Sequence, residues 1–141
     1  MGGRNRVVVV VAAVVLALAA VAVGVVALTR EDPPTSAIAT AEVVREQLDD
    51  GATVIDVRTP EEYDAGHVVD AVPADLEGGD FDGVVADLPR EAAYVVYCAS
   101  GWRAAVAVDR MMEAGFTDVV NGGGLEDMTA LGVPLEEPTD D

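Results

Sequence analysis

Residues 94–104 constrain the fold of this chain more than any other stretch of its sequence. An apolar run of β-forming residues, 94–97, ends at the only cysteine, Cys98. Arg103 follows after four intervening residues, and good helix formers come next. This order predicts a strand, a tight loop and the first turn of a helix. The thiol is then expected where loop amides converge at the positive end of a helix dipole, which favours the nucleophilic thiolate.

Short apolar strands alternate with helical patterns through the rest of the chain. Strands are predicted at 53–57, 68–72, 93–97 and 117–120, and helices at 41–48, 59–65, 81–88, 102–114 and 125–131. Thr40 and Thr59 are the expected N-caps, with Pro60 in the first helical position. Residues 121–124, Asn-Gly-Gly-Gly, are expected to form a turn. The pattern predicts an α/β domain with a mostly parallel sheet of about five strands and helices on both faces.

The N-terminal part of the chain has a different composition. Residues 7–28 carry no charge and as a helix would span roughly 33 Å, enough to cross a hydrocarbon core of about 30 Å. The arginines in residues 1–6 predict a cytoplasmic basic end, so the rest of the chain is expected outside the cytoplasm. A cleaved signal peptide, leaving a secreted protein, is the alternative. Residues 29–36 then form a proline-containing linker, 37–137 the domain and 138–141 an acidic tail.

The charge of the chain excludes two classes of partner. After residue 30, five arginines oppose 26 acidic residues, a net charge of −21, and the chain has no lysine. Such a surface repels nucleic acids and anionic lipid, so neither is expected to bind the domain, although 7–28 would lie in the bilayer. A single cysteine excludes an internal disulfide and argues against a cysteine-cluster metal site, so no metal is expected.

Three ordered blocks of residues resemble the rhodanese-like family. The first comprises 54–58, 60–63 and 65–68, the second is the loop 97–104, and the third is 120–126, followed by a similar end at 131–135. The resemblance covers about residues 37–137. It implies a rhodanese-like three-layer fold and sulfurtransferase chemistry without a cofactor.

The resemblance implies that a cysteine takes sulfur from thiosulfate or a persulfide and passes it to a thiophilic acceptor, such as cyanide or a thiol. Cys98 is the implied nucleophile and sulfur carrier. The amides of the loop are implied to bind the substrate, and Arg103 to orient an anionic donor; the loop residues are Ala99, Ser100, Gly101, Trp102 and Arg103. Asp56 and Arg58 match a motif expected to support the base of the loop.

Several departures and alternatives accompany this interpretation. Ala99 stands where family members often have arginine, which removes a charge that would attract thiosulfate, and Trp102 is bulky at a variable position. A binding or sensing module that uses Cys98 without turnover is the second hypothesis. Cysteine phosphatases and arsenate reductases are a remote one, because phosphatase loops place five residues between cysteine and arginine. His67, the only histidine, is expected to be structural rather than a general base.

Overall fold

The computed structural model describes residues 35–138 of the chain. The anchor predicted at 7–28 lies outside the described residues and stays a prediction. Within 35–138, none of the helices has the length and apolar character needed to cross a membrane.

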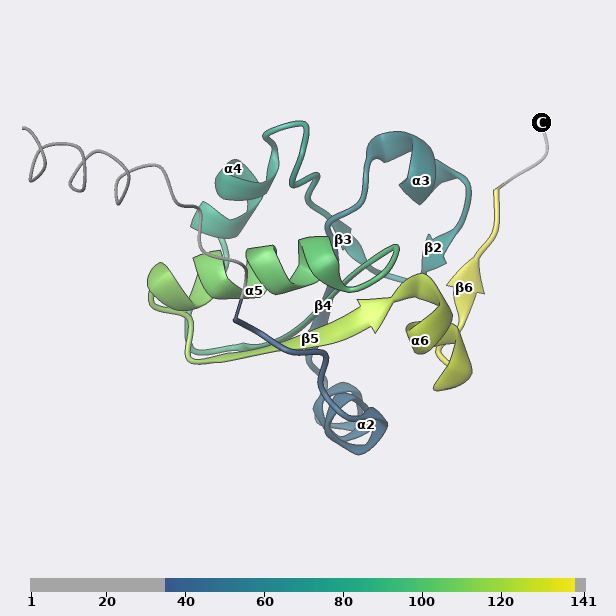
Figure 1. Ribbon diagram of the computed structural model, residues 1–141, viewed down its shortest axis with the longest axis horizontal. Helices are drawn as coiled ribbons and strands as arrows, with labels where there is room; N and C mark the ends of the chain where they lie inside the picture. Colours follow the sequence, from purple (N-terminus) through teal and green to yellow (C-terminus); the bar gives the residue numbers. More distant parts are fainter. Residues whose placement is uncertain (1–34, 139–141) are drawn as a thin grey trace, which may run out of the picture. The chain divides into compact units, whose positions relative to one another are not determined.

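A parallel sheet of four strands, in the order β3-β1-β4-β5, forms the centre of the domain (Figure 1). The strands are β1 (Thr53–Asp56), β3 (Val72–Pro73), β4 (Ala93–Cys98) and β5 (Asp118–Gly124). A separate antiparallel pair joins β2 (His67–Val68) to β6 (Leu135–Glu136). The parallel α/β class is confirmed. Within the described range, however, the main sheet has four strands rather than about five, because the two remaining short strands pair with each other.

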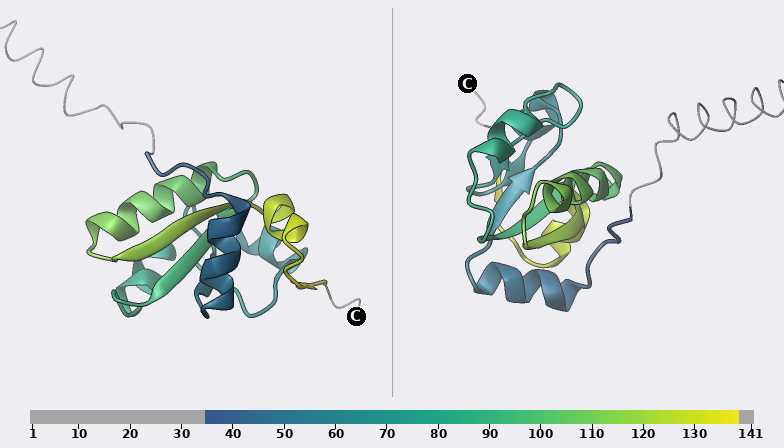
Figure 2. Two further views of the ribbon diagram at one scale, coloured as in Figure 1. Left: turned by 90° about the horizontal axis from the view of Figure 1, so that it is seen from below. Right: turned by 90° about the vertical axis from the view of Figure 1, so that its left-hand side faces the viewer.

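Helices cover both faces of this sheet, as predicted (Figure 2). The elements α4 (Phe81–Ala86) and α5 (Trp102–Glu113) pack on one face, and α2 (Ala41–Asp49) and α6 (Leu125–Ala130) pack on the other. Side chains of β4 alternate between the two layers, as a strand requires. Tyr94, Val96 and Cys98 belong to the cluster under α5, whereas Val95 and Tyr97 belong to the opposite cluster.

Two helices begin at the capping residues that the sequence predicts. At the start of α2, the hydroxyl of Thr40 accepts the N–H of Val43 at 3.4 Å. At the start of α3 (Pro60–Asp64), Thr59 and Glu62 form a reciprocal capping box, and Pro60 occupies the first turn. Because a proline lacks the N–H that this position leaves unpaired, it begins a helix at little cost.

Two local predictions are wrong. Residues 68–72 do not form one strand: the chain turns between β2 and β3, where Asp70 has a φ of +62°. Residues 121–124 do not form a turn but continue β5 alongside β4, with Gly124 opposite Cys98. The glycines suit a strand here because they lie against their neighbours too closely for side chains. A Cβ on Gly122 would lie 2.8 Å from Cγ1 of Val95.

Candidate functional site

Cys98 is the last residue of β4, at the carboxyl end of the sheet where α/β proteins bind ligands. Its side chain is buried, with 1% exposure. The Sγ atom accepts the N–H of Gly101 at 2.9 Å, within the loop that leads into α5. One of the loop amides that are expected to converge on the thiol therefore contacts the sulfur. An N–H that donates to sulfur at the start of a helix is the kind of contact that stabilises a thiolate.

Gly101 adopts a backbone conformation that residues with a side chain rarely adopt. Its φ is +91°, in the left-handed region, and it precedes the first residue of α5. A Cβ at this position would lie 2.7 Å from Cδ1 of Ile38 and 3.3 Å from Cα of Gly123. Both the conformation and the close packing therefore require glycine.

Asn121 holds the loop from the neighbouring strand, a role that the sequence analysis missed. Its side chain is buried, with the residue 2% exposed. Nδ2 donates to the carbonyl oxygens of Gly101 and Ser36, both at 3.1 Å, and Oδ1 accepts the N–H of Gly123 at 2.9 Å. The sequence feature that could have indicated this role is an asparagine directly before three glycines. Because such a sequence is typical of a turn, it did not suggest a contact with the Cys98 loop.

Gly124 provides the surface on which the start of the loop lies. A Cβ on Gly124 would be 2.3 Å from the carbonyl oxygen of Ala99 and 3.2 Å from Cα of Ser100. Ala99 and Ser100 are themselves exposed. The loop backbone thus packs directly on β5 while its first two side chains face solvent.

Arg103 lies in the first turn of α5, and its guanidinium binds two carboxylates. Nη1 and Nη2 donate to the carboxylate oxygens of Glu62 at 2.7 and 2.8 Å, and Nη1 also donates to Glu77 at 3.0 Å. The hydrogen bond from Arg103 lowers the pKa of Glu62 to about 2. The same bond raises the pKa of Arg103 above its ordinary value. Asp56 binds a different arginine, Arg58.

Asp56 and Arg58 form a buried network at the base of the loop. Arg58 donates to Asp56 through Nε at 3.0 Å and Nη2 at 2.7 Å, and Nη2 also donates to the carbonyl of Gly66 at 2.7 Å. The hydroxyl of Tyr97 donates to Asp56 and accepts the N–H of Val68. Burial raises the pKa of Tyr97, so its hydroxyl keeps its proton. Because Tyr97 immediately precedes Cys98, this network fixes the end of β4.

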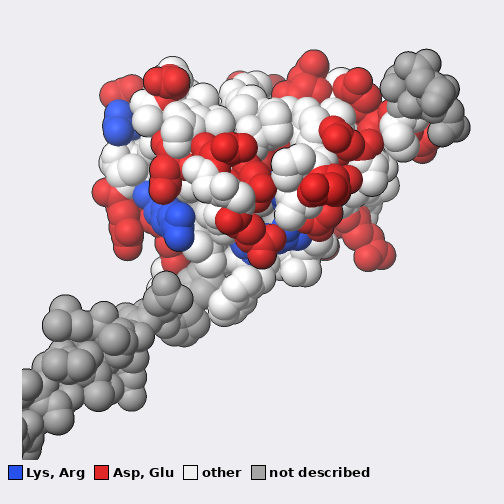
Figure 3. All heavy atoms as spheres, turned by 90° about the horizontal axis from the view of Figure 1, so that it is seen from above, with Lys and Arg blue, Asp and Glu red and all other residues white. Residues whose placement is uncertain are grey.

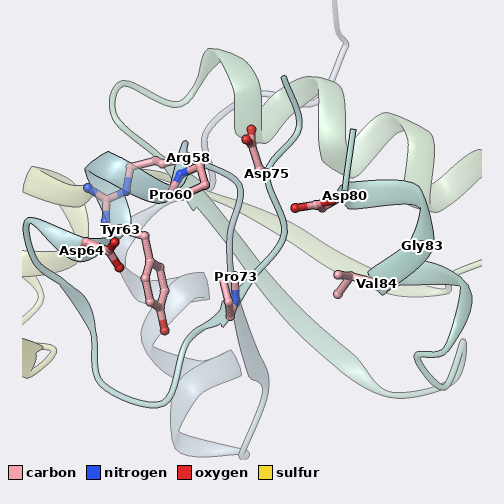
Figure 4. A pocket seen from close by; sticks show the side chains of 9 residues that line it. All are labelled: Arg58, Pro60, Tyr63, Asp64, Pro73, Asp75, Asp80, Gly83 and Val84. Carbon is pink, nitrogen blue, oxygen red and sulfur yellow. The ribbon is translucent and has the colours of Figure 1, made fainter. Parts of the chain in front are cut away.

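A cavity of about 590 Å³ lies beside this network, between α3 and α4 (Figure 4). Its walls include Arg58, the ring of Tyr63 and the carboxylates of Asp64, Asp75 and Asp80. Cys98 is not among the residues that line it. The cavity therefore lies beside the Asp56–Arg58 network and does not open onto the Cys98 side chain.

Trp102 lines a second cavity, of about 370 Å³, together with Ser100 and Gly101 of the loop, residues 35–38 and Asn121. Its side chain is 61% exposed. Thr35 and Ser36, the last residues of the predicted linker, donate backbone N–H groups to Asp109 of α5 at 2.7 and 3.1 Å. The segment that precedes the domain is thereby attached next to the loop.

His67 has the partners of a structural residue. Its ring stacks on that of Tyr63 with 3.6 Å between centroids, and Nδ1 lies 2.9 Å from the carbonyl oxygen of Tyr63. Nε2 lies 3.5 Å from a carboxylate oxygen of Glu136, in the antiparallel strand pair. These contacts occupy both ring nitrogens.

This chain is similar in sequence to a known domain family and to two known proteins. Residues 40–130 match the rhodanese-like domain. The thiosulfate sulfurtransferase PspE of Escherichia coli is 35% identical over 74 residues, 52% of this chain and 71% of PspE. The probable adenylyltransferase/sulfurtransferase MoeZ of Mycobacterium tuberculosis is 35% identical over 102 residues, 70% of this chain but 26% of MoeZ. This chain therefore spans about a quarter of the length of MoeZ.

A solved structure gives the same result for the fold. The rhodanese-like domain of the Alr3790 protein from Anabaena superposes with a TM-score of 0.60 at 30% sequence identity. The alignment covers 75% of this chain and 80% of that one.

Proposed function

The chain belongs to the rhodanese-like domain family, and on that premise we propose that it is a sulfurtransferase that carries sulfur on Cys98. The observation that carries the proposal is the position of the thiol. Sγ lies at the carboxyl end of β4 and accepts the N–H of Gly101 at 2.9 Å, directly before α5. The names of two relatives, a thiosulfate sulfurtransferase and a probable adenylyltransferase/sulfurtransferase, support the same activity.

The proposed reaction has two displacement steps. The Cys98 thiolate attacks the outer sulfur of a donor such as thiosulfate, forming a sulfur–sulfur bond. The bond between that sulfur and the rest of the donor breaks, and its electron pair leaves with sulfite. An acceptor, cyanide or a thiolate, then attacks the outer sulfur of the persulfide and restores the Cys98 thiolate. The transferred sulfur keeps its oxidation level, so the cycle needs no external oxidant or reductant.

The loop supports both steps by holding negative charge on sulfur. The N–H of Gly101 and the dipole of α5 stabilise the thiolate before attack and the terminal sulfur of the persulfide afterwards. The network of Asp56, Arg58 and Tyr97 holds the end of β4, and Asn121 holds the carbonyl of Gly101. The donor sulfur therefore meets a sulfur whose position is set before binding.

A second candidate function is a sensing module that binds sulfane sulfur or oxidants on Cys98 without turnover. One observation favours it: Arg103, the residue implied to orient an anionic donor, binds Glu62 and Glu77 instead. The two candidates differ in whether an acceptor removes the sulfur from a loaded Cys98.

Mass spectrometry of the purified full-length chain separates these functions. Treatment with a sulfur donor is expected to add a single sulfur, about 32 Da, to the peptide that contains Cys98, and cyanide is expected to remove it. Cys98→Ser is expected to abolish loading while retaining the fold, because the change is nearly isosteric. A load that cyanide does not discharge supports the sensor. Failure of every donor to load the thiol contradicts the sulfurtransferase and a sensor of sulfane sulfur, and leaves only a sensor of oxidants.

We propose further that residues 7–28 anchor the domain outside the cytoplasm. The uncharged run and the arginines before it support this location. An anchored chain is expected to stay in the membrane pellet after alkaline carbonate extraction and to dissolve in detergent. Recovery of a shortened chain in the soluble fraction would instead indicate a cleaved signal peptide.

A further inference from the structure

Arg103 supplies the positive charge of the loop that follows Cys98, and its guanidinium already binds two carboxylates of the same chain. Arg103 binds Glu62 of α3 through both terminal nitrogens and Glu77, from the loop before α4, through Nη1. One guanidinium thus faces two carboxylates, so this cluster of Arg103, Glu62 and Glu77, the arginine clamp, has a net negative charge. Glu77 is exposed, with 62% of its side chain accessible, and Arg103 is its partner.

The surroundings of the arginine clamp do not restore the positive charge. Residue 99, the first of the loop, is an uncharged alanine, and the chain contains no lysine. Asp75 and Asp80 lie in the same loop as Glu77 and line the neighbouring cavity (Figure 4). Across the face of the domain in Figure 3, acidic side chains far outnumber basic ones. A dianion that approaches Cys98 from this side therefore meets a negative potential.

We propose that Glu77 is a specificity-determining residue, and that the arginine clamp makes the protein select a persulfide donor bearing a positive charge over anionic donors such as thiosulfate. This inference rests on the proposed sulfurtransferase function. In the favoured reaction, the Cys98 thiolate attacks the outer sulfur of R–S–SH and forms a new sulfur–sulfur bond. The bond to R–S breaks, and R–S leaves with the electron pair and takes up a proton.

Glu77 is the better residue of the clamp to test, because Glu62 also accepts the N–H of Thr59 and caps α3. Glu77→Gln removes one negative charge and keeps the size of the side chain. Glu113→Gln is the matched control, since Glu113 is exposed and ends α5 about 16 Å along the helix from its first turn. Both variants change the net charge of the chain equally. A difference between their loading rates therefore shows the effect of where the lost charge lies.

The experiment measures the rate constant for loading Cys98 on the full-length chain at low ionic strength. Three donors are compared: thiosulfate, the persulfide of cysteamine, which carries an ammonium group, and the persulfide of 3-mercaptopropionate, which carries a carboxylate. The unmodified chain is expected to load faster from the ammonium donor than from the carboxylate donor. Glu77→Gln is expected to speed loading from thiosulfate by roughly three- to tenfold, because the lost carboxylate charge no longer repels the dianion.

The remaining outcomes distinguish this inference from the function on which it rests. The effect of Glu77→Gln is expected to shrink at high salt, and Glu113→Gln is expected to change loading by less than about twofold. Equal effects of the two variants, or equal rates for the two persulfides, would overturn the specificity inference and leave the sulfurtransferase function intact. Absence of loading from all three donors in every variant would refute the function and the inference together.

Discussion

Replacing Asn121 with alanine tests whether β5 holds the thiol loop. The asparagine side chain donates to the carbonyls of Gly101 and Ser36 and accepts from the N–H of Gly123. Each net hydrogen bond contributes about 1 kcal/mol, and a buried polar group without a partner costs about 1–3 kcal/mol. Because Gly101 also accepts the N–H of Ala105, one of the two carbonyls keeps a partner. We therefore expect Asn121→Ala to lower the free energy of unfolding by about 2–3 kcal/mol.

Urea unfolding monitored by circular dichroism measures this loss directly. In thermal unfolding, at roughly 4–8 °C per kcal/mol for a domain of this size, Tm is expected to fall by roughly 8–24 °C. Gln47→Ala is a suitable control, because it removes one half-buried hydrogen bond, from Gln47 of α2 to Asp118 of β5 at 2.8 Å. The control is expected to cost about 1 kcal/mol or less. A loss for Asn121→Ala no larger than that of the control would refute the assigned role.

Two further predictions concern the groups around the loop. Tyr97→Phe removes the hydroxyl that donates to Asp56 and accepts the N–H of Val68, so urea unfolding is expected to show a loss of about 1–3 kcal/mol; a neutral result would mean that water replaces the hydroxyl. The folded pKa of Glu62, about 2, lies below its ordinary 4.5, so its ionised form stabilises the fold above pH 4.5 and this stability is lost as the pH falls toward 2. The stability gap between the unmodified chain and Glu62→Gln is expected to narrow over that range, and a gap independent of pH would contradict the pairing with Arg103.

The elements of the fold could be predicted where the signal is local. The β-forming residues before Cys98 and the helix formers after Arg103 specify β4 and α5, and Thr59 with Pro60 specifies the start of α3. These signals act within a few residues and depend little on the rest of the chain. The left-handed conformation of Gly101 could be predicted for the same reason, because a sharp loop before a helix requires it.

The contacts that complete the site could not be predicted in this way. Arg103 pairs with Glu62 across 41 positions and with Glu77 across 26, and among many carboxylates the sequence does not indicate which one the fold brings close. The glycines of β5 carry a local signal, but that signal is misleading. In isolation they suggest a turn, and only the approach of the neighbouring loop to Gly124 explains them as a strand.

The burial of Cys98 limits which reagents can react with it. Sγ is in contact with Gly101 beneath a loop whose first side chains, Ala99 and Ser100, face solvent. A sulfane sulfur at the end of a donor is small and has one exposed side, so it needs little room to reach a thiolate in this position. A bulky disulfide has substituents on both sulfurs and requires the loop to move. Since Gly124 and Asn121 both hold the loop in place, we expect the proposed sulfurtransferase to favour terminal sulfur donors over disulfides.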